Sequence, residues 1–204
     1  MKDIFRWAVI LVLVGVYIAV AAAVLRPHVS PAYRAFYIDH TASDYNPVHV
    51  PGTPQEGISL GRSGLPSWVS STHGFSVREE WGRWTDADLG HIAGLTFVQP
   101  FNEDVCLDFS ASAVPWMVGK TIEIRFGTQQ QHLRLEDGPT EYRLPFVNLH
   151  NADRLDFVLP PKLPALIQES PAASDPRRLG ILLDRIRIVP GACAAATARM
   201  ANWP

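Results

Sequence analysis

The segment "EEWGRW", residues 79 to 84, concentrates side chains that could bind a ligand. On an extended strand the side chains alternate between two faces, so Glu79, Trp81 and Arg83 would share one face, opposite Trp84. A tryptophan ring can stack on the apolar face of a sugar, while a carboxylate and a guanidinium can hydrogen bond to its hydroxyl groups. Arg83 could also bind a carboxylate or phosphate through two parallel hydrogen bonds. We therefore predict that Glu79, Trp81 and Arg83 bind a ligand and that Trp84 lies in the core.

The same residues also fit a purely structural role. Glu79 and Arg83 could form an ion pair while both tryptophans pack, because large aromatic side chains contribute mainly to cores and interfaces. Gly82 adds a second alternative, since a glycine inside a strand often marks a bulge, which would break the simple alternation. The exposure of the Trp81 ring decides between a ligand-binding and a structural role.

A second polar group, "SDPRR", precedes the last predicted strand. Because proline favours an extended conformation in the residue before it, we expect Asp175 to organise the turn. Arg177 and Arg178 follow, and we predict that they contribute to the ligand site at the rim of the Trp81 face. The alternative role for Asp175 is to orient one of these arginines toward the ligand.

Sequence signatures of catalysis are weak. The pattern GxSxG occurs once, as "GISLG" at residues 57–61, but a nucleophile motif needs a helix directly after its serine and the hydrophobic pattern here predicts strands. There is no phosphate-binding loop and no HExxH motif, and the seven histidines are scattered along the chain. Neighbouring acids occur at Glu79/Glu80 and Glu136/Asp137, but adjacent residues of a strand point apart, whereas a glycosidase needs two carboxyl groups that face each other. The net charge of −2, without a basic stripe, does not indicate nucleic-acid binding. We expect no enzyme activity, no cofactor and no metal.

Alternating hydrophobic residues predict the strands that position these groups. One-sided hydrophobic sets recur at Val105/Leu107/Phe109, Ile122/Ile124/Phe126, Tyr142/Leu144/Phe146 and Leu155/Phe157/Leu159. Strands with one buried and one solvated face are typical of antiparallel sheets. About nine such strands fit between Gly57 and Pro190, which predicts an all-β, two-sheet antiparallel sandwich of jelly-roll type.

The last predicted strand changes its alternation part-way along. Its hydrophobic residues occupy one parity and then the other: Leu179, Ile181 and Leu183, followed by Ile186 and Ile188. A β-bulge near Asp184 and Arg185 would bring both sets to the core, because a bulge inserts one extra residue and resets the alternation. Residues 160–178, just before this strand, include five prolines, and a loop of this length is commonly functional or disordered.

Residues 8–25 carry no charge and predict a transmembrane helix. As a helix they would cover about 27 Å, close to the hydrocarbon thickness of about 30 Å. Lys2 and Arg6, in the preceding residues 1–7, favour a cytoplasmic N-terminus. This predicts a single-pass signal-anchor in the bacterial inner membrane with the bulk of the chain in the periplasm. The alternatives are a signal peptide that is cleaved after Ala21 or Ala23 and a helix buried in the protein core.

The remaining segments complete the predicted organisation. Prolines interrupt residues 26–56, so we expect a semi-rigid stalk with one ordered piece around Tyr33 to Ile38. Residues 57–190 would form the sandwich domain and residues 191–204 an alanine-rich tail. Cys106 and Cys193 could form a disulfide in an oxidising compartment or could remain two buried thiols, since their spacing does not fix their geometry.

Several motifs together resemble a known type of domain. They are "GLPSWVSSTHGFSVREEWGRWTD", "GLTFVQPF", "VGKTIEIRFGTQQQHLRL" and "DPRRLGILLDRIRI". Together they are similar to the C-terminal extracytoplasmic β-domain of bacterial phosphoglycerol transferase-like and related envelope-glycan membrane proteins. The resemblance covers about Ile58 to Val189, and the catalytic and multi-spanning portions of those proteins have no counterpart in this sequence.

The resemblance and the predicted anchor together suggest a function. We expect a non-catalytic periplasmic module that binds or positions a cell-envelope glycan during its synthesis, modification or export. The resemblance implies a glycan that can be anionic or phosphoglycerol-substituted. The alternative is a structural or protein-interaction module that docks onto a glycan transferase or an export complex in the membrane. An enzyme with an unrecognised site is the third alternative.

Overall fold

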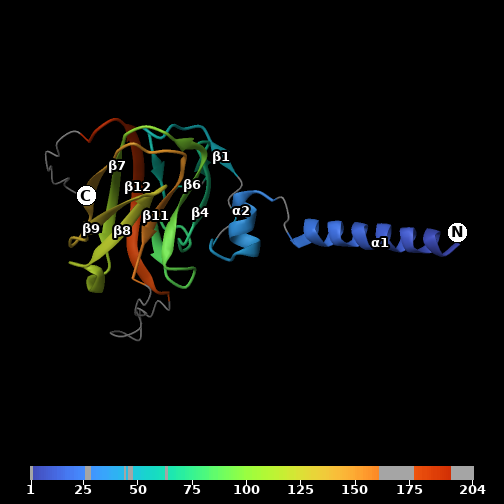
Figure 1. The fold of residues 1–204 in the computed structure, drawn as a ribbon. Coiled ribbons are helices and arrows are strands. Elements are labelled where there is room, and N and C mark those ends of the chain that lie inside the picture. Colours follow the sequence, from blue (N-terminus) through green and yellow to red (C-terminus); the bar gives the residue numbers. More distant parts are fainter. Residues whose placement is uncertain are drawn as a thin grey trace. The chain divides into compact units, whose positions relative to one another are not determined.

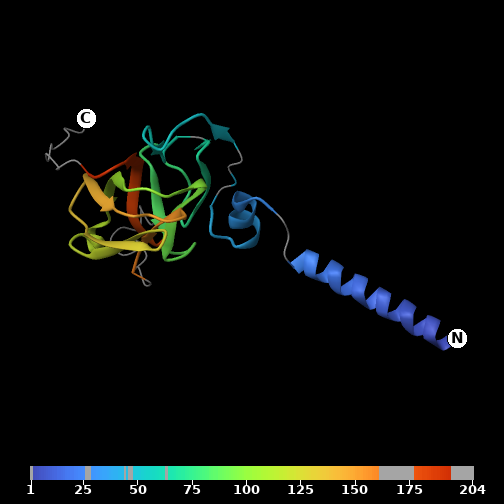
Figure 2. The same ribbon diagram turned by 45° about the horizontal axis from the view of Figure 1, so that its top comes forward.

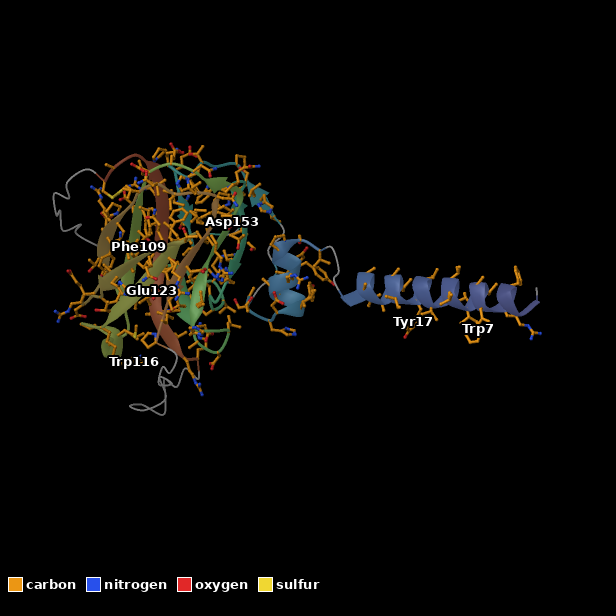
Figure 3. All side chains as sticks on the ribbon, viewed as in Figure 1. Trp7, Tyr17, Phe109, Trp116, Glu123 and Asp153 are labelled. Atoms are coloured by element: carbon orange, nitrogen blue, oxygen red, sulfur yellow. A yellow bond between two sulfur atoms is a disulfide. The ribbon has the colours of Figure 1, made fainter. Side chains whose placement is uncertain are left out.

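The computed structural model describes residues 2–25, 29–43, 45, 48–62, 64–160 and 177–193. The chain divides into two compact units, Met1–Ser30 and Pro31–Pro204. The first unit contains helix α1 (Lys2–Leu25), from which Trp7 and Tyr17 project (Figure 3). Its segment Phe5–Val24 is long and apolar enough to cross a membrane and is not buried by the protein. The predicted apolar helix is therefore confirmed, while its membrane orientation stays a prediction.

The second unit is a sandwich of two five-stranded sheets, seen from two directions in Figures 1 and 2. Sheet I consists of β2 (Ile58–Ser59), β5 (Arg83–Asp86), β7 (Val105–Ala113), β10 (Thr140–Phe146) and β12 (Leu179–Pro190). Sheet II consists of β4 (Val69–His73), β6 (Ile92–Phe101), β8 (Thr121–Phe126), β9 (Gln129–Arg134) and β11 (Ala152–Val158). Outside the two sheets, β1 (His49–Val50) pairs in parallel with β3 (Leu65–Pro66), and a 3-10 helix covers Pro115–Met117.

Both sheets are antiparallel. The order of strands is β10–β7–β12–β2 in sheet I, where β5 also pairs with β12, and β4–β6–β11–β8–β9 in sheet II. Apart from the β8–β9 hairpin, consecutive strands from β4 to β12 alternate between the two sheets, which is the pattern of a jelly roll. The predicted all-β jelly-roll sandwich is confirmed, with ten strands in its two sheets instead of about nine.

The core lies between the sheets and contains the predicted one-sided sets. Every member of these sets is buried except Leu144, which is half-buried. Phe109, labelled in Figure 3, stacks on Tyr142 and contacts the edge of Phe157 from the other sheet. The period-two pattern thus identified the residues that hold the sheets together.

The irregularity predicted in the last strand is present in β12. The pairing of β12 with β7 shifts between Leu183 and Arg185, so Asp184 is the extra residue of a β-bulge. The hydrophobic residues on both sides of the bulge are buried: Leu179, Ile181, Leu183, Ile186 and Ile188. The bulge therefore keeps the whole strand facing the core, as its sequence required.

The described part of the predicted stalk lies against the sandwich. Residues 31–38 form a short helical segment, Pro31–Tyr33 followed by the π-helical Arg34–Ile38, in which Ala35 is buried. The amide of Gly74 donates a hydrogen bond to the carbonyl of Thr41. The ordered piece expected around Tyr33 to Ile38 thus belongs to the second compact unit, and does not act as a free spacer.

Of the two states left open for the cysteines, the structure has the disulfide. Cys106 and Cys193 are linked, with Cα atoms 4.8 Å apart and a sequence separation of 87. A loop of this length implies a stabilisation of about 4–5 kcal/mol in the chain-entropy treatment. The bond ties β7 to the residues that follow β12. The proline-rich loop after Pro160, with Asp175, and most of the alanine-rich tail lie outside the described residues.

Candidate functional site

The segment from Glu79 to Trp84 is not a single extended strand. The amide of Glu79 donates to the carbonyl of Gly82 at 2.9 Å, and the amide of Gly82 donates to the carbonyl of Glu79 at 3.2 Å. Glu80 and Trp81 therefore form the tip of a tight hairpin, and β5 begins only at Arg83. The alternation of side chains that we assumed across these six residues is wrong. It breaks at Gly82, where a bulge was the alternative that the sequence allowed.

Arg83 points into the sandwich and does not share a face with Trp81. Its side chain is 3% exposed, and its Nε and one terminal nitrogen donate to the carbonyl of Ser76 at 3.0 and 2.8 Å. The guanidinium also donates to the hydroxyl of Ser43 at 3.1 Å and lies 5.8 Å from the centre of the Phe75 ring. Arg83 thus has a structural role, which corrects its assignment to the ligand-binding face.

Trp84, which was predicted to lie in the core, is half-buried and packs against the core without being part of it. Its backbone is paired with Leu182 of β12. Because Trp84 and Leu182 lie in register on neighbouring antiparallel strands, their side chains lie on the same face of sheet I. The ring therefore helps to fix β5 against β12.

The other predicted ligand residues are engaged in ion pairs. Glu79 pairs with Arg177 at 2.9 Å, and Arg178 pairs with Asp88 at 3.4 Å. The sequence did predict an ion pair for Glu79 as an alternative, but with Arg83 as the partner. None of Glu79, Arg177 and Arg178 lines the pocket that lies beside Trp81. Of the five residues predicted to bind a ligand, only Trp81 reaches this pocket.

The indole of Trp81 is 56% exposed, the largest exposure of any described aromatic side chain between residues 48 and 193. Its backbone is held by close contacts on both sides of the hairpin. A Cβ atom on Gly82 would lie 2.3 Å from the carbonyl oxygen of Leu183, and one on Gly61 would lie 2.7 Å from that of Glu80. The hairpin therefore fits closely between the residues after β2 and the bulge of β12, so Trp81 is presented on a rigid support.

A pocket of about 200 Å³ lies beside Trp81 on the outer face of sheet I. Trp81, Pro139 and Leu182 supply apolar walls, and its polar lining consists of Ser110, Ser112 and Asp184. The three polar side chains form no hydrogen bond within the described parts of the chain. Two hydroxyl groups and one carboxylate are thus available to a ligand next to an exposed indole ring.

This arrangement suits the binding of one sugar ring of a longer chain. The pocket is smaller than the sites of about 300–1,000 Å³ that enclose drug-sized molecules. The indole can cover an apolar ring face, while Asp184 accepts and the serines donate or accept hydrogen bonds. Among the residues that line the pocket, Asp184 is the single carboxylate, whereas glycoside hydrolysis requires two that face each other.

A larger cavity, about 550 Å³, lies beside Trp68 and had no signal in the sequence that we recognised. Its lining combines Trp68 and Phe101 with the polar residues Gln99, Asn102 and Glu103. However, Trp68 is half-buried and stacks on the core residue Phe97 at 5.6 Å. The side chain of Asn102 is already bonded to the amide of Asn151 and the carbonyl of Pro100. The Trp81 pocket, which has an exposed ring, is the stronger candidate.

The outer face of sheet II carries a separate charged cluster. Asp156 lies 2.9 Å from Nε2 of His73 and accepts a hydrogen bond from Nε of Arg154 at 2.8 Å. Burial raises the pKa of the Asp156 carboxyl, but the hydrogen bonds with His73 and Arg154 outweigh burial, so its pKa lies below the ordinary value. Gly94 lies in register between His73 and Asp156, and a Cβ there would lie 2.7 Å from Oδ1 of Asp156. The cluster thus links β4 to β11 across a glycine.

Comparison with protein families places this sandwich in a known group. Residues 50–190 match the family described as "Domain of unknown function (DUF7024)". The chain belongs to this family. The DUF7024 region begins within β1 and ends at the last residue of β12, so it includes the Trp81 pocket and both sheets.

The DUF7024 chain is also similar to curated proteins. It is 32% identical over 127 residues to phosphoglycerol transferase I of Citrobacter koseri and 31% identical over 127 residues to phosphoglycerol transferase I of Escherichia coli. Each match covers 62% of this chain but 16% of the relative, so the chain spans less than a fifth of the length of these relatives. The predicted resemblance to phosphoglycerol transferase-like proteins is confirmed.

Solved structures show a more distant likeness. A mutant of the carbohydrate-binding module CBM29-2 is 14% identical, with a TM-score of 0.42 over 65% of this chain and 89% of that chain. Another family 29 carbohydrate-binding module mutant is 13% identical, with a TM-score of 0.43 over 65% of this chain and 88% of that chain. Similarity at this level supports no argument about function.

Proposed function

We propose that this DUF7024 chain is a membrane-anchored, non-catalytic module that binds or positions a cell-envelope glycan in the pocket beside Trp81. The observation that carries the proposal is an exposed indole ring, fixed on a rigid hairpin, next to the unbonded side chains of Ser110, Ser112 and Asp184. Leaving a large aromatic side chain in water forgoes the stabilisation that its burial would give. A bound sugar would recover this stabilisation by covering the ring.

The rigidity of the hairpin supports binding of a flexible ligand. Immobilising side chains and loops on binding costs affinity, and a support that is already fixed avoids this cost. Gly61 and Gly82 leave no space in which the hairpin tip could shift toward the sheet. The Trp81 ring is thus set in place before a glycan arrives.

The setting that we propose is the periplasmic face of the bacterial inner membrane. Helix α1 supplies the single span, and Lys2 and Arg6 near its start favour a cytoplasmic N-terminus. The disulfide between Cys106 and Cys193 supports an oxidising compartment for the sandwich. The related proteins are named phosphoglycerol transferases, which supports an association with phosphoglycerol transfer.

The proposal is tested with the full chain in lipid nanodiscs on an array of bacterial envelope oligosaccharides. We expect selective binding, lost on Trp81→Ala and partly retained on Trp81→Phe, which keeps an aromatic face. Val147→Ala is the matched control, because Val147 is also an exposed hydrophobic residue but does not line the pocket. Unchanged binding by a folded Trp81→Ala variant would refute the site, and the absence of any bound glycan would refute the function.

A second function is supported by the coverage of the relatives. Their matched region is 16% of proteins that are named transferases, so in them this domain is one part of a much larger chain. We propose as the alternative that the chain docks onto a glycan transferase or export complex and acts beside it. Cross-linking in membranes would then identify a stable protein partner, and the complex would survive Trp81→Ala.

A further inference from the structure

The outer face of sheet I continues from the Trp81 pocket into two rows of charged residues. In the nearer row, Ser110 of β7, which also lines the pocket, is in register with Glu141 of β10 and Arg185 of β12. In the next row, Asp108 is in register with Arg143 and Arg187 on the same strands. Rows two residues apart are separated by about 7 Å along the strands. The second row thus begins about 7 Å beyond the pocket wall.

Three guanidinium groups surround this part of the face. Asp108 forms an ion pair with Arg143 at 3.2 Å and accepts a hydrogen bond from Arg187 at 2.8 Å, through different oxygens. Arg185 donates to Glu141 at 3.1 Å. Since three positive charges face two negative ones, this cluster has an excess of one positive charge, in a chain whose net charge is −2.

The arginines of the second row retain unused donors. Arg143 and Arg187 each reach Asp108 through a single nitrogen, and neither forms another hydrogen bond with the described residues. The Nε atom of Arg187 is buried and has no hydrogen-bond partner in the same part of the chain. Their side chains are 38% and 34% exposed, so a ligand on the sheet can reach them. Asp108 thereby holds two guanidinium groups in place without exhausting their hydrogen bonding.

We propose that Arg143, Arg187 and the neighbouring Arg185 form a subsite for an oxyanion substituent, a phosphodiester or a carboxylate, on the glycan that occupies the Trp81 pocket. The proposal rests on the proposed function, because it names the substituent that the same glycan carries. Guanidinium groups match such oxyanions through planar, charge-assisted hydrogen bonds. The second row begins about 7 Å beyond the pocket wall. The substituent would therefore be on a sugar unit next to the one that stacks on Trp81.

A purely stabilising role for these exposed ion pairs explains the arginine positions less well than anion binding does. Such pairs contribute little to stability, because water screens the charges and ordering long side chains costs entropy. A stabilising network would also match the number of acids to the number of bases. The excess charge and the unused donors instead fit a surface that is completed by an anion.

The test measures binding of the full chain in nanodiscs to matched pairs of oligosaccharides. Each pair shares one backbone, found on the envelope array, and differs only in phosphoglycerol or succinyl substituents. We expect the affinity for the charged member to be at least about ten-fold higher than that for the neutral member at low salt. One hydrogen bond to a charged group accounts for a factor of this size. The ratio should fall toward one in high salt. The two kinds of substituent show which oxyanion the subsite prefers.

Variants assign the effect to the arginine row. In Arg143→Gln/Arg187→Gln the ratio of charged to neutral affinity should fall to about one, while affinity for the neutral member stays unchanged. Arg125→Gln/Arg134→Gln is the control, because both arginines are exposed on sheet II and this variant loses the same two positive charges. Arg143→Lys/Arg187→Lys keeps the charge, preserves a partner for Asp108 and should recover only part of the ratio. Circular dichroism verifies that each variant is folded.

The outcomes separate the two proposals. Equal affinity of wild-type protein for charged and neutral members, with binding still dependent on Trp81, overturns the anion subsite and leaves the glycan site standing. A ratio that persists in the folded Gln variants also overturns it. If no member of any pair binds, the proposed function fails and the subsite fails with it.

Discussion

Replacing Gly82 with alanine should separate the hairpin that carries Trp81 from the sheet. Gly82 has a φ of 144°, which side-chain-bearing residues rarely adopt, and its added Cβ would lie 2.3 Å from the carbonyl oxygen of Leu183. The backbone strain costs on the order of 1–3 kcal/mol, and forcing an extra methyl group into a packed site costs a further 1–3 kcal/mol or so. We therefore expect Gly82→Ala to lower the free energy of unfolding by about 2–6 kcal/mol.

Gly90 offers a control in which only the backbone strain is present. Its φ is 140°, nearly the value at Gly82, but the nearest heavy atom to an added Cβ is 4.0 Å away. Gly90→Ala should thus lower the free energy of unfolding by about 1–3 kcal/mol, without the part caused by the clash. The difference between the two variants isolates the contact of the hairpin with β12. Urea unfolding of the full chain in detergent, followed by circular dichroism, provides both values.

The same pair of variants tests how rigidly Trp81 is held. A displaced hairpin should reduce glycan affinity in Gly82→Ala, while Gly90→Ala should bind as wild type does, because Gly90 is not among the residues that line the pocket. Equal stability of the two variants would refute the argument that close contact with Leu183 positions the hairpin. Equal glycan binding by both would show that the support does not determine the affinity.

Three further results are expected. Cys106→Ser should lower the free energy of unfolding by about 2–5 kcal/mol. A reducing agent should lower the stability of the wild type to that of the variant and should leave the variant unchanged. Trp81→Ala should change stability by less than about 0.5 kcal/mol in urea unfolding, because the exposed indole is not part of the core; a large loss would show that Trp81 has a structural role. Asp156 has a pKa below its ordinary value, so its stabilisation should be complete above the unfolded pKa of about 4 and decline as the pH falls through the folded pKa. Asp156→Asn should remove that part of the acid dependence in thermal unfolding at pH 2 to 7, and an identical pH profile would contradict the assignment.

The sandwich could be predicted from the sequence because its core obeys a local rule. Alternation with period two identified the buried residues of β7, β8, β10 and β11 without knowledge of their partners. The parity change within β12 even located the bulge at Asp184, since burial of Ile186 and Ile188 together with Leu183 allows no regular strand. These features depend only on each strand having one buried face.

The candidate binding face could be predicted only in part because its geometry depends on distant contacts. The sequence singles out Trp81, which is exposed, but the turn at Gly82 is fixed by β12 and by Gly61, which lie far away in sequence. That turn reversed the expected direction of Arg83, whose bonding partners include the carbonyl of Ser76. The row of Arg143, Asp108 and Arg187 needs the register of three strands, and no single segment reveals it.

The bulge of β12 connects the requirements of the core with those of the proposed site. By adding one residue at Asp184, it lets the strand bury hydrophobic side chains on both sides and directs the Asp184 side chain to the pocket. The carbonyl of Asp184 also accepts a hydrogen bond from the amide of Leu60 at 2.7 Å, beside the Gly61 contact that holds the hairpin. After the bulge, Arg185 and Arg187 project from the outer face, because Ile186 and Ile188 face inward. One inserted residue thus sets the positions of the hairpin, the pocket carboxylate and the arginine row together, which explains why the candidate site lies on this sheet.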